Sequence, residues 1–242
     1  MKRDNKLAPI LAIVGGAIVL VVALVVASQI NNGSSKSSSS TIATDSIAEM
    51  LSGIPQKGIE LGNPNAKLIL VEFSDPQCPF CGEWSRGTLP SLVQQYVRTG
   101  KLRIEYRGLD FLDQNFGTTD SERMLRLALA AGFQNKLWNV VELEFENQGS
   151  EGTGYANDAF IKGIAQAVTG LDANKALAAA DTNAVVPLIN AAQTLAEKKV
   201  GKNISTPTFL IERTGSSKVA KTIVGAQPLS TFTKAIDALL KK

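Results

Sequence analysis

The chain has 242 residues, a formal net charge of +3 and 44% hydrophobic residues, which is enough for one well-packed domain. Basic and acidic residues are intermixed after residue 50, so no concentrated basic face for nucleic acid is predicted. The chain contains no histidine, which excludes histidine acid–base catalysis, Ser-His-Asp and Cys-His sites, and histidine metal ligation within this chain.

An apolar segment at residues 7–30 follows Lys2, Arg3 and Lys6. About 20 apolar residues are needed to cross a bilayer as a helix. The basic flank places the N-terminus in the cytoplasm by the positive-inside rule. We therefore predict a cytoplasmic N-terminus and a single-pass transmembrane anchor within residues 1–30, with the rest of the chain outside the cytoplasm at the cell membrane.

A cleaved signal peptide is the alternative, because Val25-Val26-Ala27 offers a small-residue cleavage site. An extracytoplasmic location is oxidising, so disulfides form and persist there. Residues 31–57 begin as a Ser-rich stretch with little apolar surface, and we predict that they form a flexible linker and lead-in.

The remaining residues, 58–242, are predicted to form one α/β domain. A short edge strand within Gly58–Gly62 precedes a buried strand at Lys67–Ser74, whose continuous apolar character suits a central position in a sheet. A kinked helix is expected from Gly82 to about Arg98. Alternating residues then predict the next strand at Lys101–Gly108.

Helical periodicity follows over about residues 113–201, which predicts an all-helical insertion. Its candidate helices are Ser121–Gly132, Leu137–Asn147, Asn157–Thr169, Asp172–Ala180 and Asn183–Lys199. Strand patterns return at Thr206–Glu212 and Lys218–Val224, joined by a hairpin turn. An amphipathic helix is expected to end the domain near Leu240.

The only two cysteines, Cys78 and Cys81, are spaced as Cys-x-x-Cys between the buried strand and the following helix. Their disulfide would close a ring of only four residues and remove little entropy from the unfolded chain, which disfavours a structural crosslink. A helix N-terminus favours a thiolate on Cys78, and Pro79 suits the first helical turn. We therefore predict a redox pair with Cys78 exposed and attacked and Cys81 buried and resolving.

Three segments, in this order, resemble the DsbA-like family of extracytoplasmic thiol–disulfide oxidoreductases. They are Leu70–Cys81, Phe133–Trp138 and Ser205–Phe209. The resemblance covers about Gly58 to Leu240. It implies a thioredoxin fold, in which helices flank a mixed central sheet, with an all-helical insertion. It also implies dithiol–disulfide exchange in secreted or envelope proteins, with an oxidase expected first and with no cofactor besides the redox-active disulfide.

The resemblance also assigns roles near the cysteines. Glu72 matches a buried acid of the family, whose implied role is proton exchange with Cys81, and burial should raise its pKa. Thr206 and Pro207 match a cis-proline segment that faces the cysteine pair and binds substrate peptide as an added strand. The alternatives are a solvent-facing Glu72 on an edge strand and an ordinary trans Pro207.

Phe80 is a departure from the family pattern, because the best-known oxidase of the family has a histidine there that helps stabilise the thiolate. Phe80 offers neither charge nor hydrogen-bond donor, so a disulfide isomerase or reductase is an alternative. Since no third cysteine can accept electrons, recycling requires a partner, expected to be a membrane quinone-linked oxidase of the DsbB or vitamin K epoxide reductase type.

Two alternatives outside enzymology stay open. Cys78 and Cys81 could bind or deliver copper, because two thiolates suit Cu(I). The domain could also act as a binding or chaperone module in which the disulfide is incidental.

Overall fold

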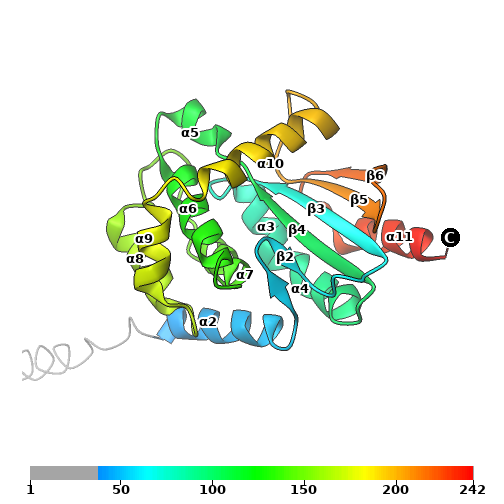
Figure 1. Ribbon diagram of the computed structural model, residues 1–242, viewed down its shortest axis with the longest axis horizontal. Coiled ribbons are helices and arrows are strands. Elements are labelled where there is room, and N and C mark those ends of the chain that lie inside the picture. The colour runs from blue at the N-terminus through cyan, green and yellow to red at the C-terminus, as the bar shows by residue number, and fades with distance from the viewer. Residues whose placement is uncertain (1–37, 242) are drawn as a thin grey trace, which may run out of the picture. The chain divides into compact units, whose positions relative to one another are not determined.

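The computed structural model describes residues 38–241 of the chain. Ala43–Lys242 form one compact unit, which contains a six-stranded mixed sheet in the order β1-β2-β4-β3-β5-β6 (Figure 1). The predicted anchor lies outside the described residues. Over residues 38–241, no helix combines the length and the apolar character needed to cross a bilayer.

The predicted central strand is confirmed. The strands are β1 (Gln56–Lys57), β2 (Glu60–Leu61), β3 (Leu68–Ser74), β4 (Leu102–Gly108), β5 (Thr208–Arg213) and β6 (Val219–Val224). β3 pairs in parallel with β4 and antiparallel with β5, and all seven of its residues are buried. Its nearly continuous apolar run reflects this position, because both of its faces are covered.

The regular elements of the predicted insertion are helices. The helices of the domain are α2 (Ser38–Leu51), α3 (Pro79–Gly87), α4 (Leu89–Leu92), a π-helix (Val93–Val97), α5 (Phe111–Phe116), α6 (Asp120–Gly132), α7 (Leu137–Glu146), α8 (Asp158–Ala167), α9 (Ala173–Ala180), α10 (Val186–Lys199) and α11 (Leu229–Leu240). Every regular element between β4 and β5 is helical, as the sequence predicts.

The predicted kink before Arg98 is a break between α3 and α4. Proline lacks the N–H that would continue a helix, but it fits a first turn. α4 begins at Leu89, so Pro90 lies in its first turn, and α3 ends before it at Gly87. The chain therefore turns without losing a hydrogen bond to the proline, and it continues as the π-helix.

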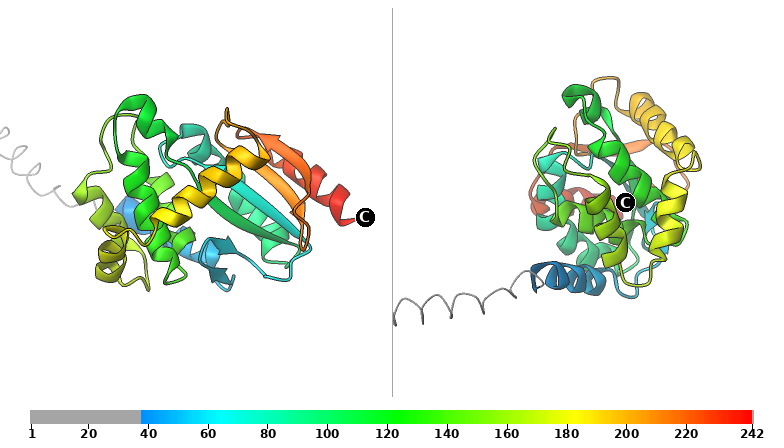
Figure 2. Two further views of the ribbon diagram at one scale, coloured as in Figure 1. Left: turned by 45° about the horizontal axis from the view of Figure 1, so that its top comes forward. Right: turned by 90° about the vertical axis from the view of Figure 1, so that its left-hand side faces the viewer.

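Alternation along β3 directs its side chains into two separate cores. Ile69, Val71 and Phe73 belong to a small core with residues of α10. Leu68 and Leu70 point the other way, into the main core shared with α3, α4 and α11. Figures 1 and 2 show α10 lying across one face of the sheet. Position 72 has the parity of Leu70 and therefore faces the main core.

The structure corrects the predicted extent of the flexible linker. Residues 31–57 are predicted to be a flexible linker and lead-in, but α2 runs from Ser38 to Leu51 and β1 begins at Gln56. Ile47, Leu51 and Ile54 are buried in the main core. Burying these side chains offsets the entropy cost of ordering the segment.

Two smaller differences concern short elements. The edge strand expected within Gly58–Gly62 is a hairpin of β1 and β2, and β2 pairs with β4. Helix α5 is not predicted, because none of its residues is buried and it has no apolar stripe. It ends at Gly117, whose positive φ of 67° allows its N–H to bond to the Asp113 carbonyl.

We expect Leu51→Ala to lower the free energy of unfolding by about 2–5 kcal/mol, because it leaves a cavity in the main core. Denaturant unfolding followed by the fluorescence of the buried Trp84 and Trp138 measures this change. Glu49→Ala, at an exposed position of the same helix, should stay within about 0.5 kcal/mol of the wild type. Equal unfolding midpoints for Leu51→Ala and the wild type would show that α2 is not part of the folded unit.

Candidate active site

The cysteine motif forms the turn between β3 and α3. Cys78 occupies the N-cap position with extended backbone angles, and Pro79 starts the helix. The Cys78 carbonyl accepts hydrogen bonds from the N–H groups of Cys81 and Gly82. This places the outer cysteine at the positive end of α3, as predicted, with the missing N–H of Pro79 at a position where helices make no such bond.

The surroundings of Cys78 favour its thiolate. Its pKa is lowered to about 6, chiefly by the hydrogen bond from the Cys81 thiol. Burial opposes the shift, whereas the Thr206 side chain and the N–H groups of Cys81 and Phe80 support it. Because hydrogen bonds to the charged form stabilise that form, Cys78 carries a negative charge at neutral pH when the pair is reduced.

The surroundings of Cys81 favour its neutral thiol. Burial raises its pKa well above the ordinary value, and the hydrogen bond and charge of Cys78 raise it further. The Ser74 side chain and the Asp75 N–H counter this only in part. The two sulfurs therefore have opposite preferences one helical turn apart.

Cys78 is less exposed to solvent than the sequence predicts. It is 5% exposed and Cys81 is 0% exposed. Cys78 is thus the more exposed of the two, as predicted, but the prediction that it is exposed was wrong. The cause is the Thr206 segment, whose carbonyl oxygen lies 3.4 Å from the Cys78 Sγ. Phe80, beside it, is 59% exposed and presents an apolar ring to solvent.

Glu72 is buried on the central strand, and the solvent-facing alternative is wrong. The residue is 1% exposed and is paired with Tyr106 on β4. Burial raises the pKa of Glu72 well above its ordinary value, and the charge of Glu142 adds to this, whereas Ser74 lowers it. A buried carboxyl group whose neutral form is favoured therefore lies in the core on the cysteine side of the sheet. Its exchange of protons with Cys81 stays a prediction.

Ser74 lies close to both the buried acid Glu72 and the sulfur of Cys81. It follows Glu72 by two residues on β3, so both side chains lie on the same face of the sheet. The Ser74 hydroxyl lowers the pKa of Glu72 and also that of Cys81, so it lies against both groups. Among the described residues, neither the Ser74 Oγ nor the Glu72 Oε2 has a hydrogen-bond partner of standard geometry. The sequence analysis missed Ser74, although the two-residue spacing was a usable signal.

Two more buried acids lie on α7, and the sequence analysis missed both. Glu142 is 4% exposed and accepts a hydrogen bond of 2.7 Å from the Ser85 hydroxyl on α3. Burial raises its pKa to about 8, although Ser85 works against the shift. Glu144 is 2% exposed, and burial raises its pKa well above the ordinary value. Glutamate is almost always exposed in helices, so helical spacing alone does not predict the burial of either residue.

Buried polar side chains hold the cysteine turn against the helical insertion. The Gln77 Nε2 donates to the Asp113 Oδ1 at 2.7 Å and to the Ser121 Oγ at 2.8 Å, while the Gln77 Oε1 accepts from the Gly152 N–H at 2.9 Å. The Asp75 Oδ1 accepts from the same Ser121 hydroxyl at 2.6 Å. Burial raises the pKa of Asp75 to about 7.

Gln148 holds the turn from its other side. Its Nε2 donates to the carbonyl oxygens of Pro76 and Cys78, at 2.7 and 3.0 Å. Two hydrogen bonds from one partly buried side chain to the carbonyl oxygens of the turn restrict the geometry of that turn. The insertion thus fixes the backbone from which Cys78 projects.

Thr206 and Pro207 lie against the cysteine pair, and the peptide bond between them is cis, as predicted. Pro207 is buried and Thr206 is half-buried just before β5. The trans alternative is therefore wrong. The binding of substrate peptide at this segment stays a prediction.

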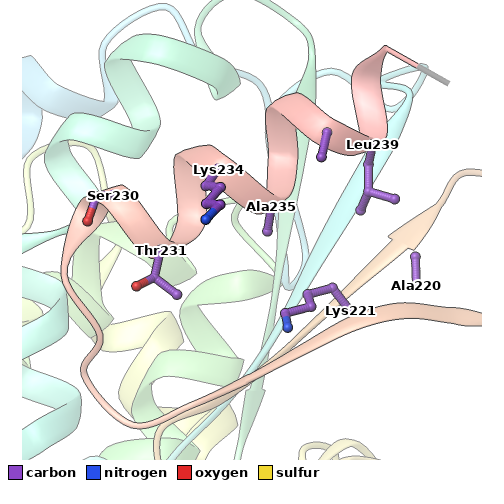
Figure 3. A pocket seen from close by; sticks show the side chains of 8 residues that line it. Ala220, Lys221, Ser230, Thr231, Lys234, Ala235 and Leu239 are labelled. Atoms are coloured by element: carbon purple, nitrogen blue, oxygen red, sulfur yellow. The ribbon is translucent and has the colours of Figure 1, made fainter.

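A groove of about 690 Å³ lies elsewhere, between β6 and α11 (Figure 3). It is lined by Ala220, Lys221, Ser230, Thr231, Lys234, Ala235, Ala238 and Leu239. None of these residues belongs to the cysteine pair or its neighbours, so the predicted site does not occupy this groove. Across residues 38–241, no three His, Cys, Asp or Glu side chains are grouped so that they could hold a metal ion.

A family model described as "Thioredoxin" matches residues 55–238. The chain belongs to the thioredoxin family. Among curated proteins it matches "Probable disulfide bond formation protein D" of Bacillus cereus and of Bacillus anthracis, each with 28% identity over 90 residues. These matches cover 36% of this chain and 39% of the relatives, so the chain spans well under half the length of the curated relatives it matches.

Solved structures share the fold over most of the chain. BdbD from Bacillus subtilis, in its oxidised form, has 17% identity and a TM-score of 0.65, covering 78% of this chain and 98% of that one. Alpha-DsbA1 of Wolbachia pipientis has 19% identity and a TM-score of 0.63, with coverage of 78% and 92%. A thioredoxin-like oxidoreductase from Silicibacter pomeroyi has 26% identity and a TM-score of 0.60, with coverage of 80% and 98%. The domain therefore has a DsbA-like thioredoxin fold.

We expect the pKa of Cys78 to depend on its two side-chain hydrogen bonds. Cys81→Ala removes the largest cause of the low pKa and should raise it most, and Thr206→Val should raise it less by removing the hydroxyl. Thiolate absorbance of the reduced protein against pH measures both. Thr222→Val, at an exposed position of β6, should leave the pKa at about 6. A Thr206→Val variant that titrates like the wild type would remove Thr206 from this account.

Proposed function

We propose that this chain is an extracytoplasmic thiol–disulfide oxidoreductase that oxidises dithiols in secreted or envelope proteins. The observation that carries the proposal is the placement of the two cysteines, with Cys78 at the N-cap of α3 and Cys81 fully buried one turn further. This placement lowers the pKa of Cys78 and raises that of Cys81. Such a pair has one good leaving group and one sulfur that stays protonated. The names of the disulfide bond formation relatives and the DsbA-like fold support thiol–disulfide oxidoreductase activity.

The proposed reaction starts from the Cys78–Cys81 disulfide. A substrate thiolate attacks the Cys78 Sγ, the S–S bond breaks, and Cys81 leaves with the electron pair and takes a proton. A second substrate thiolate then attacks the substrate sulfur of the mixed disulfide and releases Cys78 as a thiolate. The substrate loses two electrons and gains a disulfide, and the cysteine pair gains the same two electrons. Glu72 is proposed to supply the proton that Cys81 takes.

The direction follows from the stability of the reduced form. A Cys78 thiolate with several hydrogen bonds stabilises the reduced pair and makes the disulfide a better oxidant. Phe80 favours the second candidate, a disulfide isomerase or reductase, because its apolar ring adds neither charge nor donor beside Cys78. The hydrogen bonds of Cys81 and Thr206 already lower the Cys78 pKa without it, so we favour the oxidase.

Substrate peptide is proposed to bind beside the Thr206-Pro207 segment as an added strand. Two exposed apolar side chains, Phe80 and Val224, flank this proposed binding segment. Phe80 follows the reactive cysteine by two residues, and Val224, 51% exposed, is paired with Thr208 at the start of β5. They offer apolar surface to an unfolded substrate near the reactive sulfur.

The predicted anchor within residues 1–30 completes the proposal. It would hold the domain at the outer face of the cell membrane, within reach of a membrane quinone-linked oxidase of the DsbB or vitamin K epoxide reductase type. That partner would remove the two electrons from the reduced pair. No further cofactor is proposed.

We expect Cys81→Ala to accumulate mixed disulfides with substrates, because the resolving sulfur is missing while Cys78 still reacts. Cys78→Ser should abolish dithiol oxidation and trap nothing. Non-reducing gels of cells that express each variant measure this. Adducts on Cys78→Ser instead of Cys81→Ala would reverse the two roles. Tight Cu(I) binding by a wild type that oxidises no dithiol would favour the copper alternative.

We expect external protease to digest the domain in intact spheroplasts, and the mature protein to keep its original N-terminus. The basic flank and the long apolar segment are the reasons. Protection of the domain from external protease would contradict the orientation. A mature protein that begins near residue 28 would show a cleaved signal peptide in place of the anchor.

A further inference from the structure

The buried acid Glu72 needs a route by which its proton is replaced. It is 1% exposed on the central strand, with β4 on one side and β5 on the other. Once Glu72 has given its proton to Cys81, it is a carboxylate in the core, which is costly without a partner. Its own Oε2 has no hydrogen-bond partner among the described residues. Turnover therefore calls for a way to return a proton to Glu72, and a second buried titratable group near it provides one.

Glu142 lies on the helix that packs against this part of the sheet. Trp138, one turn before Glu142 on α7, lies against Tyr106, the β4 partner of Glu72, with ring centroids 6.1 Å apart.

The charge of Glu142 acts on Glu72, and the charges of Glu146 and Arg86 act on Glu142. Both of these residues are exposed, whereas Glu142 is 4% exposed. The Ser85 hydroxyl donates to the Glu142 Oε2 at 2.7 Å and fixes the carboxyl group between the core and the surface.

We propose that Glu142, held by Ser85, is the outer member of a two-carboxyl proton store, and that it restores the proton that Glu72 gives to Cys81. This inference rests on the proposed function, because it concerns the step in which Cys81 leaves the disulfide. Glu142 touches neither sulfur nor substrate and acts through Glu72, so it is a positioning residue for proton transfer.

The proton balance is simple. When two electrons from the substrate break the Cys78–Cys81 bond, the Cys81 sulfur takes one proton from the Glu72 carboxyl. Glu72 takes one from Glu142, and Glu142 takes one from solvent at the exposed surface. Each disulfide reduced thus removes one proton from solvent, and both carboxyl groups end as they began.

The titratable groups around Glu72 and Glu142 are not equally suited to supply a proton to Glu72. Tyr106 faces Glu72 from β4, but its own pKa is raised well above the ordinary value by burial, so it adds no charge. Glu144 acts on Tyr106 and is not among the groups that shift the pKa of Glu72. Arg86 favours the charged form of Glu142 and Glu146 disfavours it. Of the carboxyl groups on α7, Glu142 is thus the one that acts on Glu72.

The order of ionisation sets the pH range of the store. Burial raises the pKa of Glu142 to about 8, so Glu142 holds its proton at neutral pH, and burial also raises the pKa of Glu72 well above its ordinary value. Above about pH 8 Glu142 becomes a carboxylate, and its charge raises the pKa of Glu72 further. Glu72 then holds its proton more tightly and has no donor to replace it. The rate of Cys81 release should therefore fall as pH rises through about 8.

The experiment measures the reduction of the oxidised full-length chain by a small dithiol between pH 5 and 10, with rates expressed per dithiol thiolate. The rate of the wild type should fall as pH rises through about 8. Glu142→Gln, which keeps an acceptor for Ser85 but carries no exchangeable carboxyl proton, should be slower by about tenfold or more at neutral pH and should lose that fall. Ser85→Ala removes a bond that lowers the Glu142 pKa, so the fall should move to higher pH.

Glu144→Gln is the matched control, because it has the same side chain, helix and burial as Glu142. It should keep the wild-type rate and profile. A wild-type profile in Glu142→Gln, or the same loss in Glu144→Gln, overturns the inference. If Glu142→Gln does not fold, the Ser85→Ala variant decides. An alkaline fall in its rate at the same pH as in the wild type overturns the inference. A wild type that reacts with no dithiol at any pH contradicts the proposed function instead, so the two failures are distinguishable.

Discussion

The complete burial of the Cys81 sulfur is the constraint on which the site depends. A sulfur with no access to water is a poor thiolate, so the negative charge of the reduced pair must reside on Cys78. The start of α3 supplies backbone N–H groups there, and the neutral Cys81 thiol supplies a further hydrogen bond. The same burial creates a need for protons, since a Cys81 that leaves the disulfide must be protonated inside the core.

The rest of the fold maintains this arrangement. β3 brings Glu72 and Ser74 to the cysteine side of the sheet, because both have the parity that faces the main core. The helical insertion contributes Gln148, which holds the backbone of the turn, and Glu142, whose charge acts on Glu72. The insertion therefore does more than enlarge the domain, since it holds the turn and acts on the buried acid.

Sequence patterns predicted the central strand, the helical insertion and the cysteine turn, because each has a strong local signal. The cis bond before Pro207 and the burial of Glu72 came from a family resemblance and from the apolar neighbours of Glu72. The remaining features depend on contacts between residues that are far apart in the sequence. α2 begins within a Ser-rich stretch and is ordered by core contacts of Leu51, and Glu142 is buried where α3 packs against its helix. Cys78 lost exposure to a segment more than 100 residues away, as the sequence separation of 128 in its contact with Thr206 shows.

The most direct test of the central claim is the reduction potential of the cysteine pair as a function of pH, measured in glutathione or dithiothreitol buffers. Below pH 6 both sulfurs take protons on reduction, so the potential should fall by about 60 mV per pH unit, twice the roughly 30 mV that one proton contributes to a two-electron couple. Between pH 6 and 8, Cys78 stays a thiolate and only Cys81 takes a proton, so the slope should halve to about 30 mV. The extra stability of the reduced form is thus present above the Cys78 pKa and lost as pH falls through about 6. A slope of about 60 mV that continued unchanged to pH 8 would mean that Cys78 is an ordinary thiol, and it would contradict the account.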